Sequence, residues 1–102
     1  MARTKLEREF ETEFMELVDD LLPGGWWIKG NSQMQQGIPD RMFLWGPYWA
    51  MLEFKRASNA ELQENQDWFI EKFRNMGYAS FVSPANYQEV LDEIQQAFGV
   101  RR

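Results

Sequence analysis

The chain has 102 residues with no cysteine and no histidine, and its 16 acidic and 11 basic residues give a net charge of −5. The absence of cysteine excludes disulfides and thiolate zinc sites, and the absence of histidine leaves oxygen atoms as metal ligands, which favours magnesium, manganese or calcium. The length predicts one domain, residues 1–102, and the lack of a long apolar run or signal-peptide core predicts a cytoplasmic protein with no membrane partner.

The first predicted element is a helix over residues 4–22, which ends at the stop signal Pro23-Gly24-Gly25. At 100° per residue, Glu7 and Glu11 lie on the border of its apolar stripe, whereas Glu9, Glu16 and Asp20 face solvent. The stripe consists of Leu6, Phe10, Phe14, Leu17, Val18 and Leu21.

Three short β-type runs follow. Residues 26–29 form the first, and Trp26 and Trp27 are adjacent in it, so they cannot both face inward. Residues 41–45 and 49–54 are β-favouring and apolar, and Gly46-Pro47-Tyr48 between them has turn chemistry, which predicts a hairpin.

The second half of the chain predicts a helix, a strand and a final helix. A capping-box spacing from Ser58 to Glu61 opens the first of these helices, which ends at Gly77. Residues 78–82 form a strand, and Ser83-Pro84 opens a last helix that Gly99 closes. The apolar residues of the first of these helices are Leu62, Trp68, Phe69, Phe73 and Met76. The order α-β-β-β-α-β-α predicts an α/β fold, with a mixed four-stranded sheet flanked by helices.

Two carboxylates and a lysine meet at one end of the predicted hairpin. Asp40 begins one strand, and Glu53 and Lys55 end its antiparallel neighbour on a shared face. Without histidine, such a pair forms an oxygen-only site for a divalent metal, and a neighbouring lysine can orient water, which suits phosphodiester hydrolysis. The alternative is an ordinary ion pair with a turn aspartate. Burial of the flanking apolar strands favours a site, because unpaired buried charges are costly.

Gly37-Ile38-Pro39-Asp40-Arg41 together with Glu53-Phe54-Lys55-Arg56 resembles the motif of the PD-(D/E)XK nucleases, and the element order resembles their restriction-endonuclease-like core. More narrowly, the chain resembles the VRR-NUC branch, the virus-type replication-repair nucleases. The narrower resemblance also rests on Lys29 and on Gln66-Asp67-Trp68, and it covers about residues 7–83.

The resemblance implies a DNA endonuclease that depends on Mg²⁺, with Mn²⁺ as a substitute. It implies that Asp40, Glu53 and the backbone carbonyl of Phe54 hold the metal and that Lys55 is the catalytic lysine. It further implies a helix-one glutamate, for which Glu11 is favoured over Glu7, and a helix-two glutamine, for which Gln66 is favoured over Gln63.

The expected partner is DNA, and the resemblance implies branched DNA such as a Holliday junction or a flap. Lys29, Arg41 and Arg56 can bind phosphates, although each can equally balance nearby acids. A domain this small predicts a homodimer with two active sites, and the resemblance indicates a phage or bacterial origin. Two alternatives remain: a non-catalytic module that binds DNA or a partner, and an interaction protein that uses its exposed tryptophans.

Overall fold

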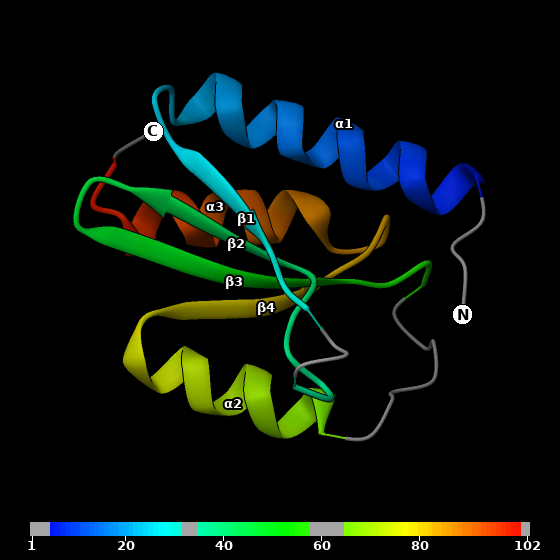
Figure 1. Cartoon of the computed structure of the whole chain (residues 1–102). Coiled ribbons are helices and arrows are strands. Elements are labelled where there is room, and N and C mark those ends of the chain that lie inside the picture. The colour runs from blue at the N-terminus through cyan, green and yellow to red at the C-terminus, as the bar shows by residue number, and fades with distance from the viewer. Residues whose placement is uncertain (1–4, 32–34, 58–64, 101–102) are drawn as a thin grey trace.

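The computed structural model of the chain describes residues 5–31, 35–57 and 65–100. Three helices and four strands alternate along the chain in the predicted order (Figure 1). Their bounds are α1 Lys5–Leu21, β1 Trp26–Lys29, β2 Arg41–Trp45, β3 Tyr48–Phe54, α2 Gln66–Met76, β4 Tyr78–Val82 and α3 Tyr87–Ala97.

The four strands form one mixed sheet, as the sequence predicted. Their order in the sheet is β1-β2-β3-β4. β1 pairs with β2 and β2 pairs with β3 in antiparallel fashion, and the two residues between β2 and β3 make a tight hairpin turn. β3 and β4 are parallel, and α2 provides the crossover that a parallel pair needs. Every strand therefore neighbours the one that follows it in sequence.

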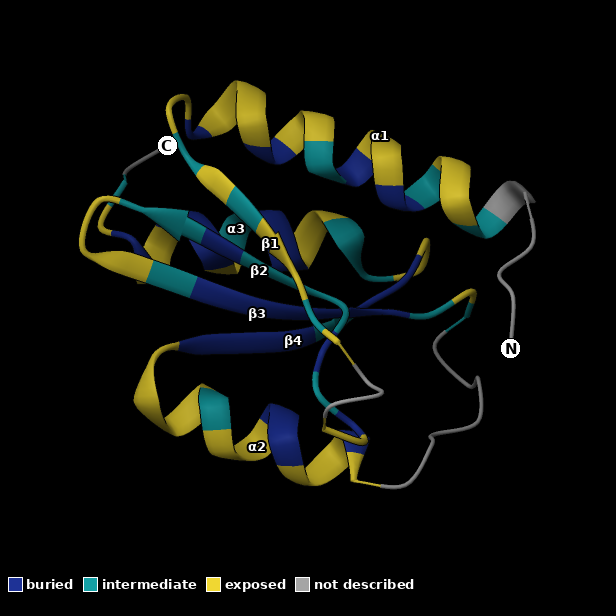
Figure 2. Ribbon diagram, in the orientation of Figure 1, coloured by how far each residue is buried: buried dark blue, intermediate teal, exposed yellow. Residues whose placement is uncertain are grey.

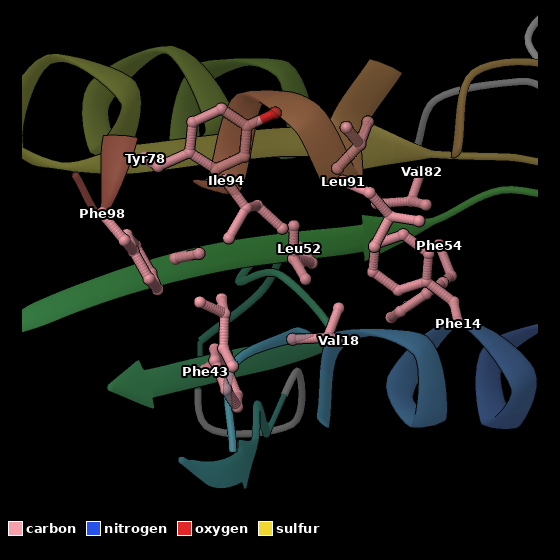
Figure 3. Packing of buried hydrophobic residues seen from close by; sticks show 13 residues of the cluster. Phe14, Val18, Phe43, Leu52, Phe54, Tyr78, Val82, Leu91, Ile94 and Phe98 are labelled. Atoms are coloured by element: carbon pink, nitrogen blue, oxygen red, sulfur yellow. The ribbon is translucent and has the colours of Figure 1, made fainter. Parts of the chain in front are cut away.

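Residues of β3 alternate between the two faces of the sheet, and this alternation decides which helix each one contacts. Ala50, Leu52 and Phe54 join the larger core with residues of α1 and α3, whereas Met51 packs with residues of α2. Figure 3 shows Phe14 and Val18 of α1 in this larger core, together with Leu52 and Phe54. Helices α1 and α3 thus cover one face, and α2 covers the other.

The two adjacent tryptophans of β1 divide between core and surface, as expected. Trp27 packs against the larger core and donates its indole N–H to Asp19 of α1 at 2.8 Å. Trp26 is 71% exposed, and Ile28 on the same side of the strand is exposed as well (Figure 2). β1 is an edge strand, so this side carries an exposed apolar pair.

Two boundaries differ from the sequence predictions, and one predicted feature is not described. Tyr48 belongs to β3 and pairs with Trp45, so it extends the strand that was predicted to begin at the next residue. Helix α3 begins at Tyr87, because Ser83 and Asn86 close a turn in which the Ser83 backbone N–H donates to Asn86 Oδ1 at 2.7 Å. The predicted capping box of the second helix, Ser58 to Glu61, lies outside the described residues.

The apolar face of α2 also differs from the prediction. Phe69 and Ile70 are the buried apolar residues of this helix, whereas Trp68 and Met76 are exposed. Phe69 and Ile70 point toward the sheet together with Gln66, three and four residues earlier, which is the spacing of one helical face. Trp68 falls between these positions and projects away from the sheet.

Tyr78 lies buried at the start of β4 and bonds to α3. Its hydroxyl donates to Glu93 Oε1 at 2.6 Å. Burial raises the pKa of Tyr78 well above its ordinary value, and the hydrogen bond to Glu93 raises it further.

Within the described part of the chain, no helix has the length and apolarity needed to cross a bilayer.

Candidate active site

The carboxylates of Asp40 and Glu53 hold the end of the β2–β3 hairpin together. The strand register pairs Arg41 with Leu52, so Asp40 and Glu53 are the next opposed positions. The Asp40 backbone N–H donates to Glu53 Oε1 at 3.1 Å, and the Phe54 backbone N–H donates to Asp40 Oδ2 at 2.9 Å. Each acid therefore accepts a hydrogen bond from the backbone of the opposite segment, and both carboxylates are fixed at one spot.

Gln66, the first residue of α2, connects Glu53 to Lys55. Its Nε2 donates to Glu53 Oε2 at 2.9 Å, and its Oε1 accepts a hydrogen bond from Lys55 Nζ at 2.5 Å. Glu53 and Gln66 are both buried, at 5% and 6% exposure. The amide of Gln66 thus supplies a donor to the anion and an acceptor to the cation, which holds the lysine and the glutamate in one network.

The fold explains why these three side chains meet. Glu53 and Lys55 are two residues apart and point to the face of the sheet that α2 covers. The backbone N–H of Lys55 donates to Val82 O at 2.7 Å, which continues the β3–β4 pairing one residue past the strand. Lys55 Nζ also lies 5.7 Å from the centre of the Phe81 ring, a cation–π contact.

Glu11 lies on the opposite side of the sheet, on α1, and is buried. Its Oε1 accepts hydrogen bonds from Arg41 Nη2 at 3.1 Å and Nε at 3.3 Å. Arg41 precedes Met42, which packs on the α2 side, so its own side chain points toward α1. The structure therefore brings Glu11 to Arg41, one residue from Asp40. Glu7 is half-buried one turn earlier in α1.

A close backbone approach positions the segment that carries Asp40. The Gly30 N–H donates to Asp40 O at 2.8 Å. A Cβ atom on Gly30 would lie 2.0 Å from the carbonyl oxygen of Pro39, which is backbone and cannot move aside cheaply. The residue after β1 must therefore be glycine for the Pro39-Asp40 peptide to lie where it does.

The three predicted phosphate-binding residues have different surroundings. Lys29 at the end of β1 and Arg56 after β3 are exposed, whereas Arg41 is half-buried against Glu11. Lys29 and Arg41 are partners in the β1–β2 register, so their backbones are adjacent near the acids. Gln63, the alternative to Gln66, lies outside the described residues.

The donor set near Asp40 fits a hard divalent cation with an incomplete protein shell. In residues 5–31, 35–57 and 65–100, no group of three or more His, Cys, Asp or Glu side chains is arranged to hold a metal. Mg²⁺ needs no such cage, because it keeps several waters and is commonly bound by one or two carboxylates and substrate phosphates. Asp40 and Glu53, joined at fixed positions, match that requirement.

Sequence reasoning missed two aspects of this region. The backbone N–H groups of Asp40 and Phe54 fix the acids, but every residue carries such a group, so no sequence signal marks them. The second missed feature is a cavity that Trp68 helps to line. The sequence signal for it was that Trp68 lies outside the helical stripe formed by Phe69, Ile70 and Phe73.

Comparison with known proteins supports the fold. No protein-family model matches the sequence, and no curated protein matches it. A solved structure described as "VRR_NUC domain protein" superposes on 97% of this chain and on 93% of its own, with a TM-score of 0.65 and 21% sequence identity. The chain therefore has the fold of that protein, including the mixed sheet and its three flanking helices.

Proposed function

We propose that this protein is a divalent-metal-dependent DNA endonuclease that hydrolyses phosphodiester bonds. The observation that carries the proposal is the network of Asp40, Glu53, Lys55 and Gln66 at the end of the hairpin. The similarity of the fold to a VRR_NUC domain protein supports a nuclease-like scaffold. A buried charged network at the edge of an apolar sheet is expected where charge serves chemistry.

In this proposal Asp40, Glu53 and the Phe54 carbonyl would hold Mg²⁺ or Mn²⁺. Glu11, which bonds to Arg41 on the other side of the sheet, would join them as a ligand only after releasing Arg41. When bound, the ion supplies positive charge to the phosphoryl group and lowers the pKa of water. Lys55 orients the attacking water and stabilises the negative charge that develops on the phosphate. Gln66 acts as a positioning residue, because its amide sets the place of the Lys55 ammonium relative to Glu53.

The assignment of the helix-one acid is tested separately. We propose Glu11, because it is buried against Arg41, the residue after Asp40. In Mn²⁺-supported cleavage, Glu11→Gln should lose more activity than Glu7→Gln. A larger loss at Glu7 would transfer the role to that residue.

Lys29, Arg41 and Arg56 are proposed to contact the DNA backbone. Each phosphate contact releases counterions, so binding should weaken steeply as salt rises. The exposed Lys29 and Arg56 should affect binding without affecting stability, whereas Arg41 should affect both, because it also pairs with Glu11.

The proposed substrate is branched DNA, a Holliday junction or a flap, cut in the cytoplasm of a phage-infected or bacterial cell. Symmetrical cuts across a junction need two active sites, so we propose a homodimer. The exposed Trp26 and Ile28 on edge strand β1 are the proposed contact with the second copy. Light scattering at micromolar concentration tests this, and a monomer there would remove the paired-cut mechanism.

The deciding experiment compares cleavage of a four-way junction, a flap and a linear duplex, with Mg²⁺ or Mn²⁺ against a chelator. We expect metal-dependent nicking that Lys55→Ala lowers by about 10²- to 10⁴-fold, the usual contribution of a positioned acid–base group. Asp40→Asn should also lose cleavage, because it removes a proposed metal ligand. Asp20→Asn, the same substitution on the exposed side of α1, is its control and should cleave as the wild type does. If wild type and Lys55→Ala are equally inert while binding persists, the protein is the non-catalytic module instead.

A further inference from the structure

A cavity of about 540 Å³ lies between residues 35–36 and the start of α2. Its volume lies within the range of about 300–1,000 Å³ that is typical of small-ligand pockets. Figure 1 shows the two segments that form it, the chain before β2 and the start of α2, next to each other below the sheet. The cavity is lined by Gln35, Gln36, Asn65, Trp68 and Phe69.

Both walls of the cavity are joined closely to the catalytic network. Asn65 directly precedes Gln66, which bonds to Lys55 and Glu53. Gln36 lies four residues before Asp40, so even a fully extended chain would separate them by at most about 14 Å. Successive nucleotides in one strand of a duplex rise by about 3.4 Å, so the cavity lies within a few nucleotide steps of the acids.

The chemistry of the lining fits a flat, neutral and polar ligand. None of the described residues that line the cavity carries a charge, so this lining itself gives a phosphate no counter-charge, and Lys72 beside Trp68 is not part of it. Glutamine and asparagine amides each present a donor and an acceptor, which is the combination that pairs with the edge of a nucleobase. Trp68 adds an exposed aromatic ring on which a base can stack.

The Trp68 side chain is mostly exposed and does not belong to either apolar core cluster. It is 57% exposed, whereas Phe69 beside it is buried. Trp27 and Trp45 donate their indole N–H groups to Asp19 and to the Pro23 carbonyl. In the described part of the chain, the Trp68 indole N–H has no such acceptor.

Two neighbours contact the Trp68 ring. Its centre lies 4.9 Å from the centre of the Phe69 ring in an edge-to-face contact, and Lys72 Nζ lies 5.6 Å from it. Asn65, three residues before Trp68 on the same wall of the cavity, adopts a left-handed conformation with φ of 70° and makes no side-chain capping bond to its helix. A tryptophan side chain has only two rotatable side-chain bonds, so ordering it against a ligand costs little freedom, which favours binding.

We infer that this cavity binds one unpaired nucleobase of the DNA, stacked on Trp68 and hydrogen-bonded by the amides of Gln35, Gln36 and Asn65. This inference rests on the proposed nuclease function and narrows its substrate class. A base inside a duplex cannot enter a cavity, whereas a base next to a strand branch is already unstacked. The protein therefore acts on DNA with unpaired nucleotides beside the cleaved bond, in preference to a fully paired four-way junction.

The first test measures binding without cleavage, by fluorescence anisotropy in a chelator. Trp68→Ala should raise the Kd for a flap by about 5- to 150-fold, the effect of losing one base–aromatic stack, and should change the Kd for a paired junction less than twofold. Trp68→Phe should retain most of the affinity. Met76→Ala, which removes an equally exposed apolar side chain from the same helix, should change neither Kd.

A second set of substrates identifies the ligand as a base. The flap is prepared with a single abasic site at each of the first four unpaired positions. At one position, wild type and Trp68→Ala should bind with equal affinity, because the stacking partner is missing. The inference is overturned if no abasic site matters, if Trp68→Ala leaves flap binding intact, or if the same loss occurs on the junction.

Cleavage with Mg²⁺ separates this inference from the proposed function. If wild type cuts the flap and Trp68→Ala has an unchanged KM, the base cavity is wrong and the nuclease proposal stands. If no substrate is cut but flap binding depends on Trp68 and on one base, the nuclease proposal is wrong and the base cavity stands.

Discussion

Replacement of Gln66 by alanine tests whether the catalytic network is a single unit. The substitution removes the donor to Glu53 and the acceptor of Lys55 at once, and it leaves the backbone of α2 intact. Alanine favours helix, so any loss of stability comes from the side chain. We expect the protein to fold with a lower free energy of unfolding.

The size of the loss follows from the burial of the two partners. Glu53 is 5% exposed, so its carboxylate cannot replace the lost donor with water. A hydrogen bond to such a charged group contributes about 1.5–3 kcal/mol, and the bond to the half-buried Lys55 contributes at most about 1 kcal/mol. Gln66→Ala should therefore lower the free energy of unfolding by about 1.5–4 kcal/mol.

Urea unfolding followed by tryptophan fluorescence measures this loss, with Asn75→Ala on the exposed side of α2 as the control. In a Glu53→Gln background the acceptor is neutral, so Gln66→Ala should cost about 1–2 kcal/mol less. Additive effects of the two substitutions would contradict the network. So would a Gln66→Ala midpoint equal to that of Asn75→Ala.

Three further predictions concern the metal, the pH and α1. Magnesium at ten times its Kd should raise the Tm of the wild type by about 6–11 °C in scanning fluorimetry, and a similar rise in Asp40→Asn would refute the ligand assignment. Because the pKa of Tyr78 is raised in the folded state, its contribution is complete below about pH 10 and declines above it by about 1.4 kcal/mol per pH unit. Urea midpoints measured from pH 9 to 11 should therefore fall less in Tyr78→Phe, and parallel curves would refute this. Arg41→Ala removes the two hydrogen bonds that Arg41 donates to Glu11 and should cost about 1.5–3 kcal/mol, which Glu11→Gln should partly restore in urea unfolding. A double variant that is no more stable than Arg41→Ala would refute the pairing.

Local patterns predicted the strands well, because glycine or proline lies close to most of the strand ends. The bounds of β1 and β4 agree with the sequence residue for residue. The start of α3 was predicted wrongly, at Ser83-Pro84 instead of Tyr87. Ser83 and Pro84 are typical of a helix start and also of the turn that Asn86 closes. Which of these forms depends on a side-chain contact that the sequence pattern does not contain.

The site was predictable to the level of residue types and strand faces. Spacing alone brings Asp40, Glu53 and Lys55 to one end of a hairpin, and the structure confirms that placement. The bridging role of Gln66 depends on how α2 packs on the sheet, and a helix rich in glutamine offers several candidates. The exposure of Trp68 was missed for a related reason, since apolar residues in a helix are usually assigned to its buried face.

The contact at Gly30 bears on how tolerance to mutation is interpreted in this protein. Gly30 carries no side chain that could bind metal, water or DNA, yet any larger residue must displace the Pro39-Asp40 peptide. A library selected for DNA cutting would therefore reject substitutions at position 30 as firmly as those at position 40. Intolerance at a single position in this chain can thus report the path of the backbone, and a catalytic role should be assigned only where the side chain itself reaches the reacting groups.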